Sequence, residues 1–292
     1  MKNFIIFALS LLLYPVCSEG VRSIKKNISP PLSLDYSVKN YLDSGDRSTE
    51  IGIAISKQNL ISNKKLPVVV FIHGGGWKTG DKDQNIWQCF NYAHKGYIAI
   101  TISYRLLDEA PFPQCIIDVK TAIRFIKSLS EDYPIDTENI GVWGYSAGGH
   151  LALMIALDDD SSSFDSGLYN EYDNSVKCAA VIAAPTDFSN KERGSRILSK
   201  EQWKSDSFKS KISPITYINS KQPPIMMIHG TVDRIVPPYH YKNFADLCMK
   251  ESIKNFELEE AENHDHMFYF KDKKYPNLVF EYFEKMLKND QK

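Results

Sequence analysis

Residues 140–150 read IGVWGYSAGGH, and this stretch decides the fold. Its first four residues are apolar enough to form a buried strand, and a helix can begin at Ala147. Between them lies a Gly-x-Ser-x-Gly sequence centred on Ser146. Between a strand and a helix, this sequence is typical of a nucleophile elbow, a sharp turn that exposes the serine hydroxyl at a helix N-terminus. The stretch therefore predicts that Ser146 is a nucleophile in an α/β protein.

Strands and helices alternate along the rest of the chain. We predict strands at residues 51–55, 67–72, 98–102, 140–143, 176–184, 225–228 and 256–260, and helices at 115–129, 147–157, 239–249 and 277–287. Several of the strands are apolar throughout, so both faces of their sheet must be covered. This pattern indicates an α/β fold with a mostly parallel central sheet and helices on both faces.

A glycine-rich stretch, HGGGW at residues 73–77, directly follows a predicted strand. Its three glycines leave backbone N–H groups unshielded, so the loop can donate hydrogen bonds to an oxyanion. We expect the amides of Gly75, Gly76 and Ala147 to form an oxyanion hole. A phosphate-binding loop is the rival interpretation, but the Lys-Ser/Thr ending and the G-x-G-x-x-G spacing are both missing. His73 is expected to fix the loop, because the base of such a site comes late in the chain.

Two C-terminal turns contain the candidates for the acid and the base. HGTVDRIVP at residues 229–237 follows one predicted strand, and ENHDH at residues 262–266 follows the next. The order serine, aspartate, histidine is the order in which a fold with a nucleophile elbow presents its triad. We expect Asp233 to be the acid that orients the base. Asp187 is the alternative acid.

His264 and His266 compete for the role of base. In an extended chain, residues two apart point the same way, so direction alone does not choose between them. Asn263 tolerates the left-handed conformation that would let the chain leave the strand sharply. We therefore predict that His264 is the base, with His266 as the alternative. His150 is expected to pack in the core.

Residues 1–18 predict an export signal. Lys2 precedes an apolar run at residues 4–13, and small residues follow it, as in a secretory signal peptide. The run is too short to span a bilayer as a helix. We expect residues 1–18 to be a signal peptide and residues 19–292 to be one domain that is secreted or periplasmic. An uncleaved anchor and a lipoprotein attached through Cys17 are weaker alternatives.

Composition excludes several other classes of protein. The 292 residues contain 35 basic and 36 acidic side chains, a net charge of −1, which argues against a nucleic-acid binder that works by bulk charge. A hydrophobic content of 43% excludes a disordered chain. No metal or cofactor is expected, and the acidic run 158–160 lacks the spacing of a calcium loop, so we expect it to be a solvated loop. Beyond the signal the cysteines could be buried thiols or form two disulfides; they are Cys89, Cys115, Cys178 and Cys248.

The ordered motifs resemble those of α/β-hydrolases in the carboxylesterase and hormone-sensitive-lipase-like branch. The matching segments are HGGGW, YRL at 104–106, PFP at 111–113 before Asp118, GYSAGGH, SPITYI at 213–218 and HGTVDRIVP. Over roughly residues 45–290 the chain is most similar to the bifunctional feruloyl/acetyl-xylan esterases (the BD-FAE type). The resemblance implies an α/β-hydrolase fold, an open site without a large helical cap, and structural roles for Arg105 and Asp118. The family commonly has His-Gly-Phe at the base, where this chain has HDHMF.

These observations predict an exported serine esterase that works through an acyl-enzyme and needs no cofactor. The resemblance implies a small-molecule or carbohydrate ester as substrate, with acetyl or feruloyl esters of carbohydrate as the finer expectation. A serine peptidase, amidase or formamidase is the alternative enzyme. A catalytically inactive hydrolase-fold binding module is the alternative from another class, although such proteins typically lose a triad member. The sequence does not indicate the oligomeric state.

Overall fold

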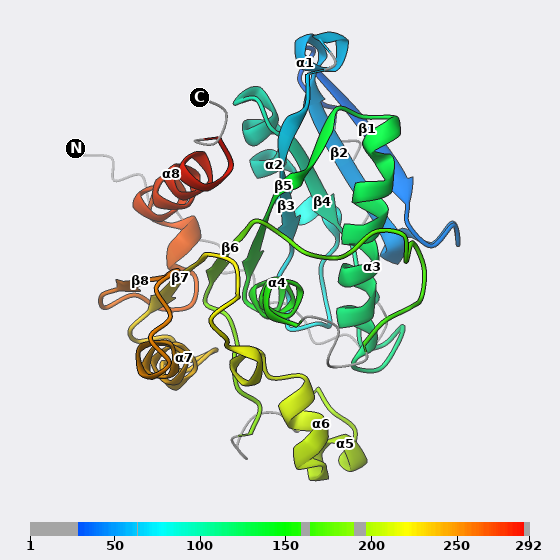
Figure 1. Ribbon diagram of the computed structural model, residues 1–292. Helices are drawn as coiled ribbons and strands as arrows, with labels where there is room; N and C mark the ends of the chain where they lie inside the picture. The colour runs from blue at the N-terminus through cyan, green and yellow to red at the C-terminus, as the bar shows by residue number, and fades with distance from the viewer. Residues whose placement is uncertain (1–28, 63, 159–163, 190–196, 289–292) are drawn as a thin grey trace, which may run out of the picture.

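The computed structural model describes residues 29–62, 64–158, 164–189 and 197–288, shown in Figure 1. The predicted signal peptide lies outside these residues. The strands are β1 (Leu34–Asn40), β2 (Glu50–Ser56), β3 (Leu66–Ile72), β4 (Ile98–Ile102), β5 (Ile135–Tyr145), β6 (Cys178–Ile182), β7 (Ile225–Gly230) and β8 (Phe256–Ala261). The helices are α1 (Lys57–Ser62), α2 (Ile86–His94), α3 (Gln114–Ser128), α4 (Ala147–Leu157), α5 (Lys200–Lys204), α6 (Asp206–Lys211), α7 (Tyr239–Lys250) and α8 (Lys274–Lys288).

All eight strands form one sheet in the order β1-β2-β4-β3-β5-β6-β7-β8. β2 runs antiparallel to both β1 and β4, and the strands from β4 to β8 are mutually parallel. The predicted α/β fold with a mostly parallel sheet is confirmed. The sequence does not predict edge strand β1, whose side chains are mostly half-exposed, or the short helix α2.

The helices cover both faces of the sheet (Figure 1). In β3, Val68, Val70 and Ile72 belong to the core beneath α3, α4 and α7, whereas Val69 and Phe71 belong to the core beneath α2 and α8. Side chains alternate between faces along a strand, so a strand buried on both sides must be apolar at every position. This requirement explains why the central strands lack the polar alternation of half-exposed strands.

Several ion pairs connect helix α3 to the segments around it. The Arg105 guanidinium Nη2 donates to Asp118 Oδ1 at 2.6 Å, which confirms the structural role expected for both residues. Lys120 Nζ lies 3.2 Å from Asp158 Oδ2, and both side chains are fully buried. The expectation of a solvated loop is therefore wrong for Asp158, whose charge is neutralised inside the protein. The rest of that acidic run lies outside the described residues.

The cysteines within the described residues are buried free thiols. They are Cys89, Cys115, Cys178 and Cys248. Burial raises the pKa of each thiol, to about 12 for Cys248. A thiol that stays protonated is a poor nucleophile, so these side chains act as small apolar groups. Across the described ranges, every helix is too short or too polar to cross a lipid bilayer.

Candidate active site

Ser146 occupies a sharp turn between β5 and α4. Its backbone has φ 55° and ψ −119°, a conformation that residues other than glycine rarely adopt. A Cβ on Gly144 would overlap the Gly148 carbonyl group, and a Cβ on Gly148 would overlap the carbonyl oxygens at the end of β3. The turn can close only because both positions lack a side chain. The Ser146 amide donates to the Ile182 carbonyl at 2.8 Å, which ties the turn to β6.

The structure brings Ser146, His266 and Asp233 together. His266 Nε2 lies 3.0 Å from Ser146 Oγ, and His266 Nδ1 lies 2.6 Å from Asp233 Oδ2. All three residues are buried. A carboxylate can only accept a hydrogen bond, so Nδ1 carries the proton and Nε2 is left to accept the serine hydroxyl proton. This arrangement has the geometry expected of a nucleophile, a base and an orienting acid.

The Asp233 carboxylate is held by the backbone of its own turn. Its Oδ1 accepts hydrogen bonds from the amides of Ile235 at 2.8 Å and Val236 at 2.9 Å. Its Oδ2 remains for His266, as the sequence predicts for the acid of the site. The alternative acid, Asp187, lies elsewhere: its amide donates to His240 Nδ1 at 3.3 Å and its carboxylate accepts from the Ser189 amide.

The prediction that His264 is the base is wrong in its geometry. His264 Nδ1 donates to the Glu262 carbonyl oxygen at 2.6 Å, and the His264 ring packs 5.7 Å from that of Tyr275. This histidine is partly exposed and does not contact Ser146. His266 occupies the position that the sequence reasoning assigned to His264.

The reason lies in the path of the turn after β8. Asn263 adopts the expected left-handed conformation, with φ 58°, but the chain does not continue as an extended strand. Instead the His264 carbonyl accepts a hydrogen bond from the Val232 amide at 3.2 Å, and the Asp265 carboxylate accepts one from the Met267 amide at 2.9 Å. The chain curls back, so residues two apart do not point the same way. Only the second histidine reaches the serine.

Two residues that support His266 were not found from the sequence. The Tyr145 hydroxyl donates to the His266 carbonyl at 2.7 Å and so fixes the histidine turn against the elbow. His229 Nε2 donates to the Val236 carbonyl at 2.9 Å and lies 3.5 Å from Asp233 Oδ2. Tyr145 lies within the motif GYSAG and His229 within HGTVD, so both residues stood out in the sequence. The motifs alone do not indicate which groups these side chains contact.

The glycine loop at residues 73–77 lies directly against the elbow. A Cβ on Gly74 would lie 2.9 Å from the Tyr145 carbonyl oxygen and 3.4 Å from Ser146 Cβ. Gly75 and Gly76 have φ values of 113° and 61°, which favour glycine. Within the described ranges, no backbone carbonyl or side chain accepts a hydrogen bond from the amides of the predicted oxyanion hole, which are those of Gly75, Gly76 and Ala147.

His73 and His150 have the structural roles that the sequence predicts. His73 Nδ1 donates to the Gly74 carbonyl at 2.7 Å, and its ring stacks on Tyr104 with centroids 4.2 Å apart. His150 Nε2 donates to the Ile212 carbonyl at 2.8 Å. The ring of Trp77, at the end of the glycine loop, packs 5.3 Å from the His150 ring, so this tryptophan is part of the core.

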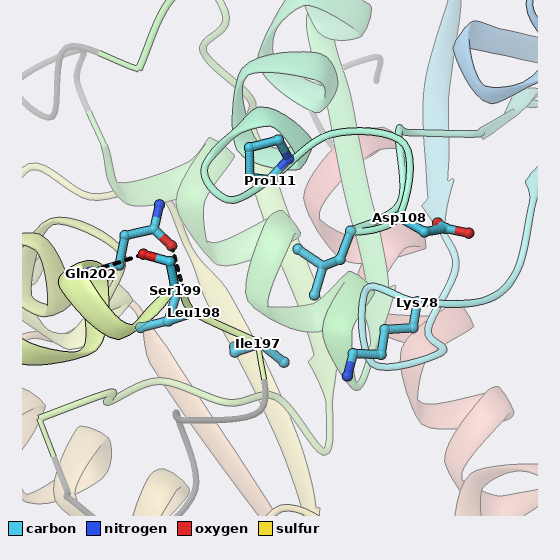
Figure 2. A pocket seen from close by; sticks show the side chains of 8 residues that line it. Lys78, Asp108, Pro111, Ile197, Leu198, Ser199 and Gln202 are labelled. Carbon is cyan, nitrogen blue, oxygen red and sulfur yellow. Dashed lines mark hydrogen bonds between the residues drawn. The ribbon is translucent and has the colours of Figure 1, made fainter. Parts of the chain in front are cut away.

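A cavity of about 490 Å³ lies beside the glycine loop (Figure 2). It is bounded by the loop after β4 and by the segment that leads into α5. Gln202 Nε2 donates to the Phe112 carbonyl at 2.7 Å and holds these two walls together. The lining is mainly aliphatic with one cation and one anion, and consists of Lys78, Leu107, Asp108, Pro111, Ile197, Leu198, Ser199 and Gln202.

Three buried histidines are neutral in the folded protein. Burial lowers the pKa of His73 and of His150 to about 4, and that of His240 to about 3. His240 Nδ1 accepts a hydrogen bond from the Thr186 amide at 3.2 Å, which requires an unprotonated nitrogen. The unfolded chain binds protons at these positions near pH 6.5 and the folded chain does not, so acid favours unfolding.

Above about pH 6.5 we expect these histidines to have no effect on the free energy of unfolding. As the pH drops from there towards 4, the free energy of unfolding should decrease by ~1.4 kcal/mol per pH unit for each such histidine. His240→Asn retains an acceptor and removes one titrating group, so the variant should lose less stability over this range. Urea unfolding at several pH values measures the difference. The control is His94→Asn, which replaces an exposed histidine. Identical slopes for wild type and His240→Asn would contradict the assignment.

Together, the sheet order and the turn at Ser146 define an α/β-hydrolase fold, in which hydrogen bonds link Asp233, His266 and Ser146 in series. The BD-FAE family profile matches residues 56–247, and the chain belongs to this family.

Curated relatives and a solved structure agree with this class. The chain is 31% identical over 192 residues to the probable carboxylic ester hydrolase LipM of Mycobacterium tuberculosis, covering 62% of this chain and 44% of the relative. It is 26% identical over 223 residues to the esterase LipQ of the same organism, covering 73% and 52%. The chain thus spans about half the length of these relatives. The esterase Est2 of Thermogutta terrifontis has the same fold, with a TM-score of 0.73, 23% identity, and coverage of 90% of this chain and 97% of its own.

Proposed function

We propose that this protein is an exported serine hydrolase that cleaves carboxylic esters. The observation that carries the proposal is the chain of contacts from Asp233 through His266 to Ser146, with distances of 2.6 and 3.0 Å. The names of the curated relatives, a carboxylic ester hydrolase and an esterase, favour esters over the amides of a peptidase or formamidase. An inactive binding module would not need to retain this complete arrangement.

In the proposed mechanism, His266 Nε2 accepts the Ser146 proton as Oγ attacks the ester carbonyl carbon. The carbonyl oxygen becomes an oxyanion, which accepts hydrogen bonds from the amides of Gly75, Gly76 and Ala147. Each such donor typically contributes ~3 kcal/mol to the stability of the transition state. His266 then protonates the leaving alkoxide, and an acyl-enzyme remains on Ser146.

Water then hydrolyses the acyl-enzyme. In this half of the reaction the water is the nucleophile and Ser146 is the leaving group. His266 accepts a proton from the water as the water oxygen attacks the acyl carbon, and the new oxyanion accepts hydrogen bonds from the same amides. The bond between the acyl carbon and Ser146 Oγ then breaks, and His266 returns the proton to Oγ as the carboxylic acid leaves. Asp233 fixes the imidazole tautomer and stabilises the imidazolium that forms twice in each cycle. Every proton transfer in this scheme is made by this chain's own residues and the water.

Export of the protein is the second part of the proposal. It is supported by the basic residue and the apolar run within residues 1–18, which lie outside the described residues. The location that we propose is therefore the periplasm or the medium.

The direct test of the proposed function uses the wild-type protein. We expect it to hydrolyse p-nitrophenyl acetate, and a fluorophosphonate probe to abolish that activity by forming a covalent adduct. Mass spectrometry of the digested protein should place the adduct on the peptide that contains Ser146. Activity that persists after complete labelling, or a label on another serine, would contradict the proposal. A parallel assay with EDTA serves as a control for a metal-dependent contaminant and should show full activity.

A further inference from the structure

One buried histidine, His229, lies beside the acid of the site but has no step in the proposed mechanism. It lies near the end of strand β7, four residues before Asp233, and is fully buried. A polar ring costs free energy when it is removed from water, unless its polar atoms find partners inside the protein. The contacts of this ring therefore indicate what it does.

The hydrogen bonding of His229 defines which of its nitrogens carries the proton. Nε2 lies 2.9 Å from the Val236 carbonyl oxygen, which can only accept a hydrogen bond, so Nε2 is the protonated nitrogen. Nδ1 is buried and has no hydrogen-bond partner among the described residues. Burial lowers the pKa of the ring below its ordinary value, so the imidazole is neutral at neutral pH. Because an apolar side chain would fill this space without burying Nδ1, packing alone does not account for a histidine here.

Val236 links the His229 ring to the Asp233 carboxylate. The Val236 carbonyl accepts the hydrogen bond from His229, and the Val236 amide donates to Asp233 Oδ1 at 2.9 Å. The Ile235 amide donates to the same carboxylate oxygen at 2.8 Å. The turn that aims the carboxylate is thus joined to β7 twice, through the chain at Asp233 and through the His229 ring at Val236. A shift of Val236 would carry its amide away from Oδ1 and leave the carboxylate freer to rotate.

His229 also lies close to the carboxylate oxygen that bonds His266, without competing for it. His229 Nε2 is 3.5 Å from Asp233 Oδ2, whereas His266 Nδ1 is 2.6 Å from the same oxygen. The longer distance exceeds that of an ordinary N–H···O hydrogen bond. A neutral ring at this place adds no positive charge of its own, so the charge of Asp233 remains available to the imidazolium that forms on His266.

The His229 ring is supported on another side by an aromatic residue of α7. The Tyr241 ring packs 4.9 Å from the His229 ring, and the Tyr241 hydroxyl donates to Glu260 Oε1 on β8 at 2.5 Å. The support of the acid thus runs from β8 through α7 to β7. Each link in it is a contact between side chains of the folded protein.

We propose that His229 is a positioning residue, which holds the turn that aims Asp233 at His266 by means of the Val236 carbonyl; this inference rests on the proposed function. His229 does not act on the ester itself. When the Asp233 carboxylate is held, it fixes the proton on His266 Nδ1, and His266 Nε2 is then ready to accept the serine proton. A displacement of ~1 Å in such an arrangement can lower the rate by ~100-fold.

The first test replaces His229 by leucine, which removes the donor and keeps an apolar filling. We expect His229→Leu to lower kcat for p-nitrophenyl acetate by roughly ten- to a hundredfold and to leave KM within about twofold, because Asp233 does not bind the ester. His229→Gln should restore most of the activity, since its amide nitrogen can reach the Val236 carbonyl. His229→Asn is too short to do so and should resemble His229→Leu, which it replaces if leucine prevents folding.

A double-mutant cycle separates positioning of the acid from a general loss of structure. In an Asp233→Ala background there is no carboxylate to aim, so His229→Leu should change kcat by less than about twofold. The matched control is His240→Leu, the same substitution at a buried histidine whose ring accepts a hydrogen bond from the Thr186 amide instead. This control should leave kcat within about twofold. Circular dichroism of each variant checks that the fold is retained.

Proton NMR gives a readout that does not depend on activity. A proton held between His266 Nδ1 and a carboxylate gives a signal far downfield, which is assigned by its loss in His266→Ala and Asp233→Ala. The signal should weaken or shift in His229→Leu and persist in His229→Gln and His240→Leu. If the wild type does not hydrolyse the ester, the proposed function fails and this signal alone decides the role of His229. With an active wild type, an unchanged kcat in His229→Leu, an equal loss in the Asp233→Ala background or an unchanged downfield signal would each overturn the inference.

Discussion

Replacement of His266 by alanine is expected to lower kcat for p-nitrophenyl acetate by roughly three or more orders of magnitude, as loss of a triad base does. The variant lacks the imidazole that lies 3.0 Å from Ser146 Oγ and that, in the proposed mechanism, accepts the serine proton and passes it to the leaving group. The KM should change little, because the imidazole acts in the proton transfer of the transition state more than in binding the ester. Steady-state kinetics over a range of ester concentrations measures both constants.

The matched control for this prediction is His264→Ala, in the same turn. Its side chain donates to the Glu262 carbonyl and packs near Tyr275, so its loss should cost about tenfold or less, the effect of a ~1.4 kcal/mol perturbation. If His264→Ala were the more damaging of the two, the base would be His264 and the observed geometry would not be the active one.

Ser146→Ala is expected to have the largest effect on activity, about a millionfold in kcat, by analogy with removal of the serine from another triad enzyme. Alanine removes the Oγ that forms the acyl-enzyme and leaves the oxyanion amides in place. The backbone at this position stays at φ 55°, so the substitution neither relieves nor adds strain in the turn. The free energy of unfolding should therefore change by no more than ~1 kcal/mol.

Activity and stability must be measured on the same preparation of Ser146→Ala. Urea unfolding and circular dichroism establish that the variant is folded, and the fluorophosphonate probe should no longer label it. A folded variant with turnover close to that of the wild type would show that the serine at the elbow is not the nucleophile. A variant that fails to fold would be replaced by Ser146→Gly, since glycine adopts a positive φ freely.

The central strands and the elbow were predictable because their signals are local. A strand buried on both faces must be apolar at every position, and residues 67–72 and 98–102 satisfy this requirement by themselves. The Gly-x-Ser-x-Gly sequence likewise fixes its own backbone, because glycine is required wherever the turn brings main chains into contact. Strand β1 was missed for the opposite reason: it is an edge strand with half-exposed side chains, so its sequence has no continuous apolar run.

The position of Asp233 was predictable and the histidine beside Ser146 was not, and the difference is physical. The Asp233 carboxylate is held by the amides of Ile235 and Val236, two and three residues later, so a short stretch of sequence determines where it points. The position of His266 depends on contacts far away in the chain. These are the hydrogen bond from the Tyr145 hydroxyl to the His266 carbonyl and the one from the Val232 amide to the His264 carbonyl. No local pattern in residues 262–266 encodes them.

By itself, the sequence determined the fold class and the positions of Ser146, Asp233 and the glycine loop, because each is set by residues that are neighbours in the chain. Only the tertiary structure decided which histidine meets the serine. This outcome depends on distant segments packing against one another, because the turns after β7 and β8 interlock. Packing of this kind depends on the shape of the whole core, which no short stretch of sequence specifies.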